Sequence, residues 1–429
     1  MGRALRHRNY RLFFAGQSIS FIGNWLTHVA SAWIIYRLTG SALLLGLATF
    51  ASQAPSFFLS PFAGVWADRM NKHRALLVTQ VLAMVQSSLL AYFALTNTLG
   101  VPHIIALNLF QGLISAVDIP VRQSFVVQMI EDRADLGNAL ALNSSMVNSA
   151  RLIGPTIAAA LIGLVGEGYC FLIDALSYVA VLASLLAMRV KPVPVRASGK
   201  RVLQELREGL SYVAHFPPIR AVLLLLTAFA LAGMPYSTLL PVIAREQLHG
   251  EAGTLGVLTG AAGAGALIGA LYLAGRPTVL GLGRVINKAG LVFGVGLMAS
   301  SQAPWLALAM PLMVVVGAGM MVQLAACNTI VQTLVDEDKR GRVMALYSMA
   351  VFGVMPFGSL LAGRASDAFG AGPTLLAGGA ICCVASLAFR HTLPGLREHI
   401  RPIYVRLGIL PELERSLNEA THVSEPPPA

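Results

Sequence analysis

Charged residues are scarce in this chain: they make up 12% of its 429 residues, whereas soluble domains carry about 25%. That is too little charge for an ordinary water-exposed surface. Cysteines are few as well, and the four of them lie in or beside apolar runs, at spacings typical of neither zinc sites nor disulfide frameworks. The sequence therefore argues against a soluble fold and against a cysteine-based metal site.

Motifs of common enzyme chemistry are missing too. The sequence contains no Gly-rich phosphate loop ending in Lys-Ser or Lys-Thr, no His-Glu-x-x-His and no nucleophile elbow. Glycines between Gly263 and Gly269 superficially resemble a dinucleotide loop, but they lie within an apolar run with no preceding strand. We therefore expect no enzyme activity, no metal and no cofactor.

Long apolar runs are what the sequence has in abundance. Hydrophobic residues make up 56% of the chain and its mean hydropathy is +0.69. The runs reach the roughly 20 residues that a membrane-spanning helix needs, and their uniform apolarity excludes the alternating strands of a barrel. We predict an all-α membrane protein with twelve transmembrane helices, at about 10–36, 42–66, 74–96, 101–130, 135–165, 168–188, 217–243, 253–275, 285–301, 304–333, 341–364 and 372–390.

The positive charge is distributed unevenly about these spans. The formal net charge is +11, and most Lys and Arg fall in the N-terminal segment, in the loops on its side and in the C-terminal tail, while the opposite loops hold only Arg37, Arg245 and Arg364. This asymmetry follows the positive-inside rule. It predicts a multi-pass protein of the plasma (inner) membrane with both termini cytoplasmic, and it explains the charge without nucleic acid as a partner.

A polar break divides the spans into two sets of six. We expect an N-terminal bundle at 1–190, a cytoplasmic linker at 191–216, a C-terminal bundle at 217–391 and a partly disordered cytoplasmic tail at 392–429. Within the linker, residues 202–213 could form an amphipathic helix on the membrane surface.

The two halves resemble each other. Val127-Gln128 matches Val331-Gln332, Asp132 matches Asp336, and Gly154 matches Gly358 at one constant offset. These matches place the fourth and fifth helices in the same orientation as the tenth and eleventh. Two such pseudo-symmetric six-helix bundles are the architecture of major facilitator transporters.

The loop after the second span carries a basic motif with one carboxylate, formed by Gly64, Asp68, Arg69, Lys72 and Arg74. It resembles motif A of the major facilitator superfamily. The resemblance implies that Asp68 meets the positive N-terminal end of the eleventh helix, where Lys339, Arg340 and Arg342 lie, and acts as a cytoplasmic gate. The alternative is that Asp68 and Arg69 are merely solvated loop charges.

Two further stretches resemble family motifs. Arg151 to Pro155 is similar to motif C, which is associated with exporters; Gly154 would serve close packing and Pro155 would bend the helix. Gln111-Gly112 fits the end of motif B, but Asn108 replaces its arginine, so the proton relay of that motif cannot be carried over. The stretches 118–163 and 338–363 resemble the branch that includes enterobactin exporters and macrolide efflux proteins.

Ionisable side chains within spans are costly and suggest function. Asp118 and Arg122, four residues apart, can pair on one helix face. Protonation of Asp118 would free Arg122 for proton–substrate exchange; alternatively, the two form a static ion pair. Arg151 could hold a substrate anion or pair with Asp118 or Asp174, and we expect Asp174 near the outer end of its helix.

Polar side chains in other spans are candidates for a central cavity. Gln17, Asn24 and His28 share one face of the first span, which would be penalised if it faced lipid. The remaining candidates, which could instead bond between helices, are Gln53, Asn108, Gln111, Asn148, Tyr236, Gln323 and Asn328.

The resemblance implies a monomeric secondary transporter working by alternating access, powered by the proton gradient and exporting a small amphipathic molecule such as a siderophore or drug. Its partners would be that substrate and membrane lipids. A proton-coupled importer or a lipid-type flippase on the same fold is the alternative. A receptor or scaffold without transport activity is a third interpretation.

Overall fold

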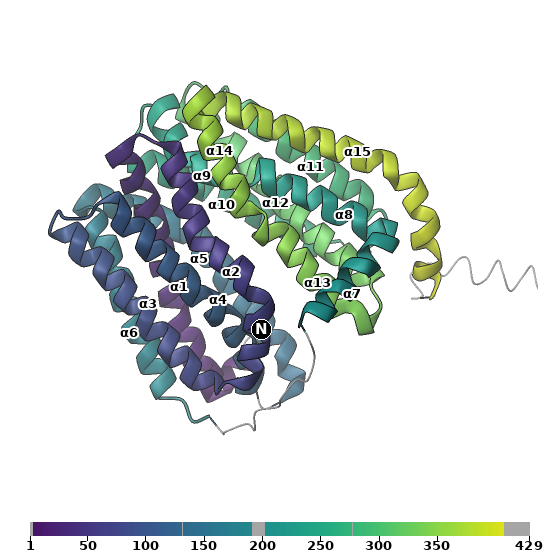
Figure 1. The fold of residues 1–429 in the computed structure, drawn as a ribbon, viewed down its shortest axis with the longest axis horizontal. Coiled ribbons are helices and arrows are strands. Elements are labelled where there is room, and N and C mark those ends of the chain that lie inside the picture. Colours follow the sequence, from purple (N-terminus) through teal and green to yellow (C-terminus); the bar gives the residue numbers. More distant parts are fainter. Residues whose placement is uncertain (1–2, 131, 191–201, 277, 407–429) are drawn as a thin grey trace, which may run out of the picture.

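The computed structural model describes residues 3–130, 132–190, 202–276 and 278–406, except for side chains at 60–61, 63–69, 133, 148, 202–206, 338, 396–400 and 406. In this part of the chain the regular elements are all helices (Figure 1). The long ones in the first half are α1 (Arg8–Thr39), α2 (Ala42–Arg69), α3 (Lys72–Leu95), α4 (Val101–Met129), α5 (Leu136–Val165) and α6 (Glu167–Leu186). The α-helices of the second half are α7 (Val202–His215), α8 (Pro217–Ala228), α9 (Tyr236–Val242), α10 (Ala252–Ala274), α11 (Leu282–Ser300), α12 (Leu306–Leu334), α13 (Glu337–Ser348), α14 (Met355–Phe369) and α15 (Ala371–Arg406). Short helices occupy Arg3–Arg6, Arg133–Asp135, Phe229–Gly233, Ile243–Gln247 and Met349–Gly353.

The helices form two bundles with corresponding packing. In the first bundle α1 and α3 pack on α6, and α2 packs on α4; in the second, α8 and α11 pack on α15, and α10 packs on α12. Figure 1 shows the first bundle in purple and blue beside the second in teal, green and yellow. The prediction of an all-α fold with two pseudo-symmetric bundles is therefore confirmed.

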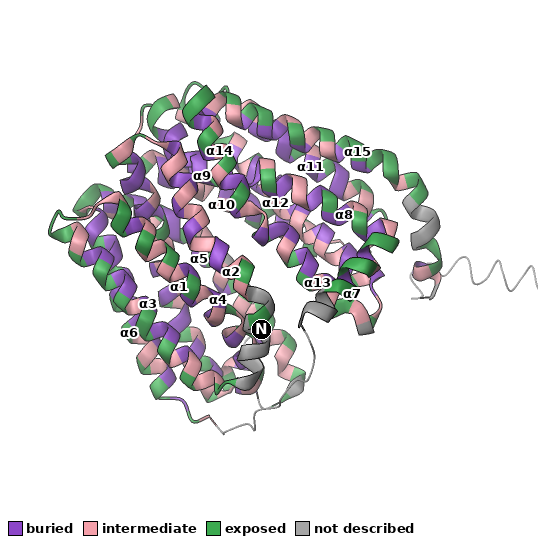
Figure 2. Ribbon diagram, in the orientation of Figure 1, coloured by how far each residue is buried: buried purple, intermediate pink, exposed green. Residues whose placement is uncertain are grey.

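The number of membrane-spanning segments is close to the predicted twelve. Among the described residues, eleven helical segments are long and apolar enough to cross a membrane. Helix α1, with 32 residues, is also long enough, but a row of polar side chains lowers its hydropathy. Exposed large apolar side chains such as Leu176, Leu271 and Val384 cover the outer faces of the bundles (Figure 2). Lipid is the solvent in which such a surface is stable.

Two predicted spans are interrupted rather than continuous. The span at 217–243 consists of α8 and α9 joined by a π-helical turn at Phe229–Gly233, and the span at 341–364 contains another at Met349–Gly353. Pro235 and Pro356 follow these turns. Proline lacks the N–H of a regular helix, so the backbone widens before it. The last helix also runs to Arg406, beyond the predicted end at 390.

The bundles touch mainly along two helix pairs, α2 with α14 and α5 with α10. Small residues allow these contacts: a Cβ on Gly363 would lie 2.4 Å from the carbonyl oxygen of Ala42, and one on Gly256 would lie 2.0 Å from the Cβ of Ala159. These contacts lie toward the ends where α2 begins and α5 ends, which we call the closed side. The ribbons diverge toward the opposite end, the open side, where the N-terminal helix and α13 lie (Figure 1).

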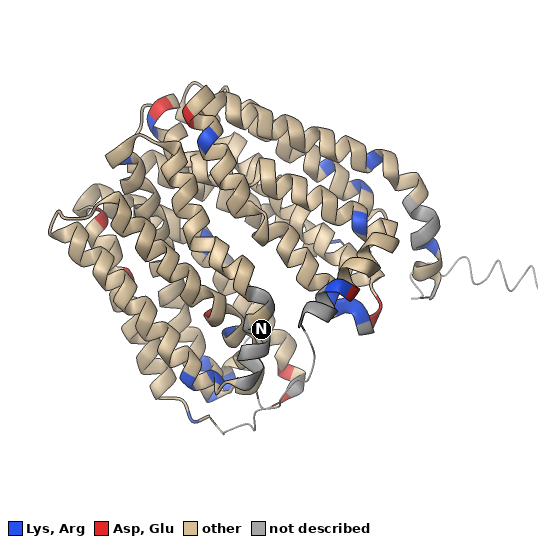
Figure 3. Cartoon of the chain, in the orientation of Figure 1, with Lys and Arg blue, Asp and Glu red and all other residues tan. Residues whose placement is uncertain are grey.

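Charged residues gather at the ends of the helices and leave their middles nearly free (Figure 3). Lys and Arg are more prominent at the open side, around the N-terminus, α7 and α13. This is the arrangement that the membrane-spanning prediction requires, because a charge at the depth of the acyl chains is costly.

Candidate functional site

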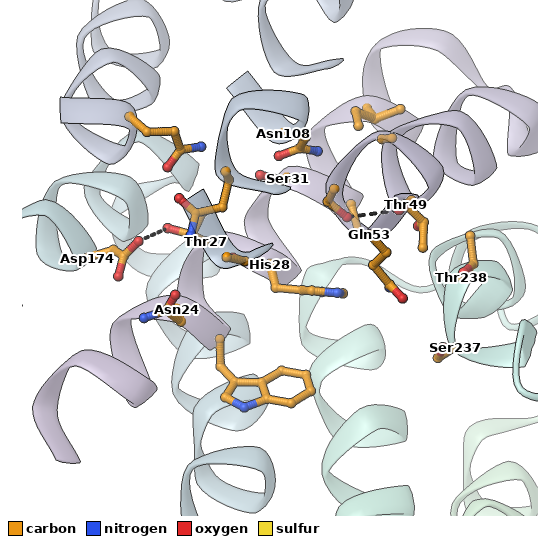
Figure 4. A pocket seen from close by; sticks show the side chains of 18 of the residues that line it. Asn24, Thr27, His28, Ser31, Thr49, Gln53, Asn108, Asp174, Ser237 and Thr238 are labelled. Carbon is orange, nitrogen blue, oxygen red and sulfur yellow. Dashed lines mark hydrogen bonds between the residues drawn. The ribbon is translucent and has the colours of Figure 1, made fainter. Parts of the chain in front are cut away.

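A cavity of about 300 Å³ lies between the bundles. Most of its wall comes from α1, α2, α4 and α6 of the first bundle, and α9 and α14 of the second contribute Ser237, Thr238 and Met355. His28 extends into the centre of the cavity, with Asp174 and Asn24 on one side and Ser237 and Thr238 on the other (Figure 4). Because both bundles contribute to it, the cavity changes whenever they move relative to each other.

The wall contains polar atoms that make no hydrogen bond within the described residues. They are Asp174 Oδ1, Ser31 Oγ, Gln86 Nε2 and Gln111 Oε1. Each buried polar group without a partner costs about 1–3 kcal/mol. Four such groups around one cavity indicate a binding site whose partners are a ligand or water.

Asp174 is the one acidic residue of this wall. Its Oδ2 accepts hydrogen bonds from Thr27 Oγ1 and Ser87 Oγ, both at 2.7 Å, and the residue is 1% exposed. No Lys or Arg pairs with it among the described residues. Asp174 lies seven residues into α6, in the half of the helix where we expected it, roughly 10 Å along the axis from its first residue, and it packs between α1 and α3.

Another buried carboxylate, that of Asp118 on α4, has a different environment. Arg122 pairs with its Oδ2 one turn away, as predicted, while Thr79 Oγ1 and Gln80 Nε2 each donate to its Oδ1 at 2.8 Å. Arg122 also donates to Gln17 Oε1 at 3.4 Å. We call these five residues the Asp118 cluster. Its carboxylate is compensated by a cation and two further donors, and none of its members lines the cavity.

The two carboxylates follow one interhelical boundary. Helix α3 supplies Thr79 and Gln80 to Asp118, and two turns further along it supplies Ser87 to Asp174. Near the second site Tyr178 donates to Asn24 at 3.2 Å. The boundary thus carries a paired carboxylate nearer the open side and an unpaired one at the cavity.

The predicted cavity residues divide into two groups. Asn24, His28, Gln53, Asn108 and Gln111 line the cavity. The others do not: Gln17 belongs to the Asp118 cluster, Gln323 is buried, Asn328 bonds Gln332 at 2.5 Å, and Tyr236 packs on Phe293. Asn148 lies outside the described side chains.

Arg151 on α5 pairs with neither Asp118 nor Asp174, and within the described part of the chain it has no ion-pair partner. The adjoining motif acts in packing. A Cβ on Gly154 would lie 2.5 Å from Trp25 Cβ, and Pro155 lies inside an unbroken α5, its carbonyl oxygen 3.0 Å from the Cβ position of Gly256. The motif therefore holds α5 against both α1 and α10.

The predicted gate can be followed only in part. Gly64, Asp68 and Arg69 end α2 but their side chains lie outside those described, and Lys72 and Arg74 begin α3. On the partner side, Arg342 pairs with Glu208 of α7 at 3.0 Å, and Arg340 approaches Glu337 at 4.0 Å.

The closed side carries an interbundle contact that the sequence did not suggest. Asp367 of α14 accepts hydrogen bonds from Ala42 N at 2.6 Å, from Leu43 N at 3.1 Å and from Ser41 Oγ at 2.8 Å. Its carboxylate thereby caps the N-terminus of α2, where the helix dipole favours an anion. Tyr36 of α1 donates to Glu246 of the second bundle on the same side.

Sequence reasoning also missed the residues that α3 contributes. Thr79, Gln80, Gln86 and Ser87 were not candidates, although all of them bond a buried carboxylate or line the cavity. The sequence did contain a signal for them, because the amide side chains of Gln80 and Gln86 lie in one apolar span and need buried hydrogen-bond partners.

Comparison with known proteins agrees with this architecture. The family model described as transmembrane secretion effector matches residues 3–403. The staphyloferrin A transporter of Staphylococcus aureus is 27% identical over 84% of this chain and 90% of its own. The multidrug efflux pump Tap of Mycobacterium tuberculosis is 26% identical, over 88% and 91%. Macrolide efflux protein A of Streptococcus pyogenes is 21% identical, over 89% and 96%.

Solved structures share the fold. A bacterial homolog of the human lysosomal transporter Spinster, inward-facing and unoccupied, has a TM-score of 0.69 and 15% identity, with 89% of this chain and 96% of that chain covered. A bacterial homologue of the iron transporter ferroportin, in the inward-facing state, has the same TM-score and identity, with 90% and 98% covered.

Proposed function

Because this chain belongs to the transmembrane secretion effector family of the major facilitator superfamily, we propose that it exports an amphipathic small molecule in exchange for protons by alternating access. It is a multi-pass membrane transporter and not an enzyme. The observation that carries the proposal is the interbundle cavity, whose wall includes a buried carboxylate with no cation partner among the described residues.

The cavity supports a cargo with both apolar and polar parts. Phe21, Trp25 and Tyr178 supply aromatic surface, and the amides of Gln53, Asn108 and Gln111 supply hydrogen bonds. The relatives are named for transport of staphyloferrin A, of macrolides and of multiple drugs, and we propose a siderophore or drug as the cargo of this chain. The energy source would be the proton gradient, and the unit a monomer in the inner membrane with cytoplasmic termini.

The two carboxylates would have separate tasks. We assign proton transfer to Asp174, because a carboxyl without a cation partner can be neutral in one state and ionised when the cavity opens to water. The Asp118–Arg122 pair would remain a fixed structural contact between α1, α3 and α4, since all its atoms except Arg122 Nε are already partnered. Binding of cargo would then compete with protonation of Asp174 in the same cavity.

Transport in a reconstituted system tests the proposal. The full chain in proteoliposomes, oriented so that export fills the vesicle, should accumulate a labelled siderophore or a labelled macrolide when the lumen is acidic. A protonophore should reduce accumulation to the level of protein-free vesicles, because export is coupled to proton return. Accumulation that the protonophore leaves unchanged would rule out proton coupling, and equal signals with and without protein for every cargo would rule out efflux of these classes.

The cap on α2 gives a second expectation. Asp367→Asn removes the negative charge that caps this helix N-terminus, which is worth about 1 kcal/mol or less at an exposed site. We expect the fraction of molecules in which the closed side has opened to rise by up to roughly fivefold. Distances between spin labels on the first turn of α2 and the last turn of α14 would report the shift.

The matched control for this shift is Glu251→Gln. Glu251 is an exposed acidic residue directly before α10, and no hydrogen bond or ion pair among the described residues joins its side chain to the other bundle. Equal label distances in the two variants would show that the cap does not hold the closed side together.

A further inference from the structure

A second hollow, of about 560 Å³, lies on the outer face of the second bundle, between α10, α11 and α12. We call it the lateral groove. Arg276, Arg284 and Lys288 stand around one part of it, and Tyr272, Val292 and Val322 line the rest. It is distinct from the interbundle cavity, because the two share no residue.

The three cations of the groove have no anionic partner in the part of the chain that the structure describes. None of them forms an ion pair within the described residues, and Arg276 Nε is buried with no hydrogen-bond partner, while its Nη2 donates to Leu280 O at 3.0 Å. A buried guanidinium N–H left unsatisfied costs free energy. An anion in the groove would relieve that cost.

The position of two of these cations is itself unfavourable. Helix α11 begins at Leu282 after Gly281, with no side-chain cap and no acidic residue in its first turn. Arg284 therefore stands in the first turn, at the positive end of the helix dipole, and Arg284 and Lys288, as like charges four residues apart, repel each other. Both penalties turn into gains when a negatively charged group binds between them.

The rest of the groove indicates where that anion comes from. The apolar side chains beside it face outward, with Leu271, Tyr272 and Val292 respectively 64%, 54% and 44% exposed. On a membrane-spanning bundle these side chains contact acyl chains, whereas the cations lie where α10 ends and α11 begins. Phosphate-binding cations above an apolar channel match an amphiphile with an anionic head.

We propose that the lateral groove binds an anionic phospholipid, with its phosphate between Arg276, Arg284 and Lys288 and an acyl chain along Val292 and Val322. The site holds the ends of α10 and α11 together through a lipid instead of an acidic side chain. Because α10 also packs on α5 of the other bundle, the bound lipid would contact a helix that moves in transport.

Lipid retention tests the proposal. The full chain is reconstituted in nanodiscs of phosphatidylcholine with phosphatidylglycerol, extracted in detergent, and its co-purifying lipids are measured by native mass spectrometry. The variant Arg276→Gln/Arg284→Gln/Lys288→Gln should bind phosphatidylglycerol on the order of 100-fold more weakly, since each basic residue contributes about a fivefold factor. The charge-matched control Arg207→Gln/Arg390→Gln/Arg401→Gln, in exposed residues outside the groove, should retain it as the unmodified protein does.

Two further measurements make the outcome decisive. Val292→Trp fills the groove without changing its charge, and it should also displace the lipid. Inorganic phosphate added to phosphatidylcholine nanodiscs should bind negligibly. If both triple variants lose the same amount of bound phosphatidylglycerol, the lipid is held only by the general attraction between positive charge and anionic lipid. If inorganic phosphate binds tightly, the groove is a site for a soluble anion. Either result overturns the proposal. Circular dichroism of each variant verifies that it is folded.

Discussion

Replacing Asp174 by asparagine is expected to abolish proton-driven efflux, reducing it to the level of protein-free vesicles. The substitution keeps the shape of the side chain, and its amide oxygen can still accept from Thr27 and Ser87. It removes the acidic group that we propose as the proton carrier at the cavity. The measurement is the accumulation of labelled cargo driven by an imposed pH gradient.

A second measurement, cargo exchange, separates a role of Asp174 in proton coupling from a purely structural role. Exchange of labelled for unlabelled cargo across the membrane needs no net proton movement, so Asp174→Asn should retain it while losing accumulation. Loss of both activities would indicate a misfolded cavity, and unchanged accumulation would remove Asp174 from the coupling mechanism. Asp132→Asn, in an exposed acidic residue between α4 and α5, serves as the control and should transport normally.

Gly317→Ala is expected to destabilise the second bundle by at least about 3 kcal/mol, at the upper end of ordinary overpacking. A Cβ at this position of α12 would lie 1.9 Å from the carbonyl oxygen of Ala262 on α10. Backbone cannot turn aside as a flexible side chain can, so the two helices must separate. Lower yield of monodisperse protein and a lower midpoint of thermal unfolding in detergent would report the effect.

Gly163→Ala provides the comparison. Gly163 lies on α5 with nothing within 4 Å of its Cβ position, so alanine there should change stability by no more than about 1 kcal/mol. If the two variants unfold at the same midpoint, the close approach of α10 and α12 does not limit stability.

The fold could be predicted from the sequence because the bilayer imposes a simple rule: an apolar run of sufficient length must be a helix. The sequence matches between the two halves of the chain then predicted the two bundles. The pairing of Asp118 with Arg122 was also predictable, since residues four apart on a helix are neighbours. None of these inferences requires knowledge of which helix faces meet.

The site was harder to predict because it depends on which helix faces meet. Gln323 and Asn328 were indistinguishable in sequence from Asn108 and Gln111, yet only the latter pair lines the cavity. Asp174 near the start of an apolar run gave no indication that α1 and α3 would supply Thr27 and Ser87 as donors. The cap formed by Asp367 joins residues more than 300 positions apart, and no periodicity within a span encodes such a contact.

The π-helical turn at Phe229–Gly233 affects how this chain should be aligned with its relatives. A π turn accommodates one residue more than an α turn, and one residue rotates an α-helix by about 100°. The turn therefore determines that Ser237 and Thr238, instead of Tyr236, reach the cavity. A relative with one residue fewer in this stretch would present a different face of the helix at the same aligned column. Comparisons of cargo-contacting positions across the family should therefore place a gap within 229–233 wherever the turn is absent.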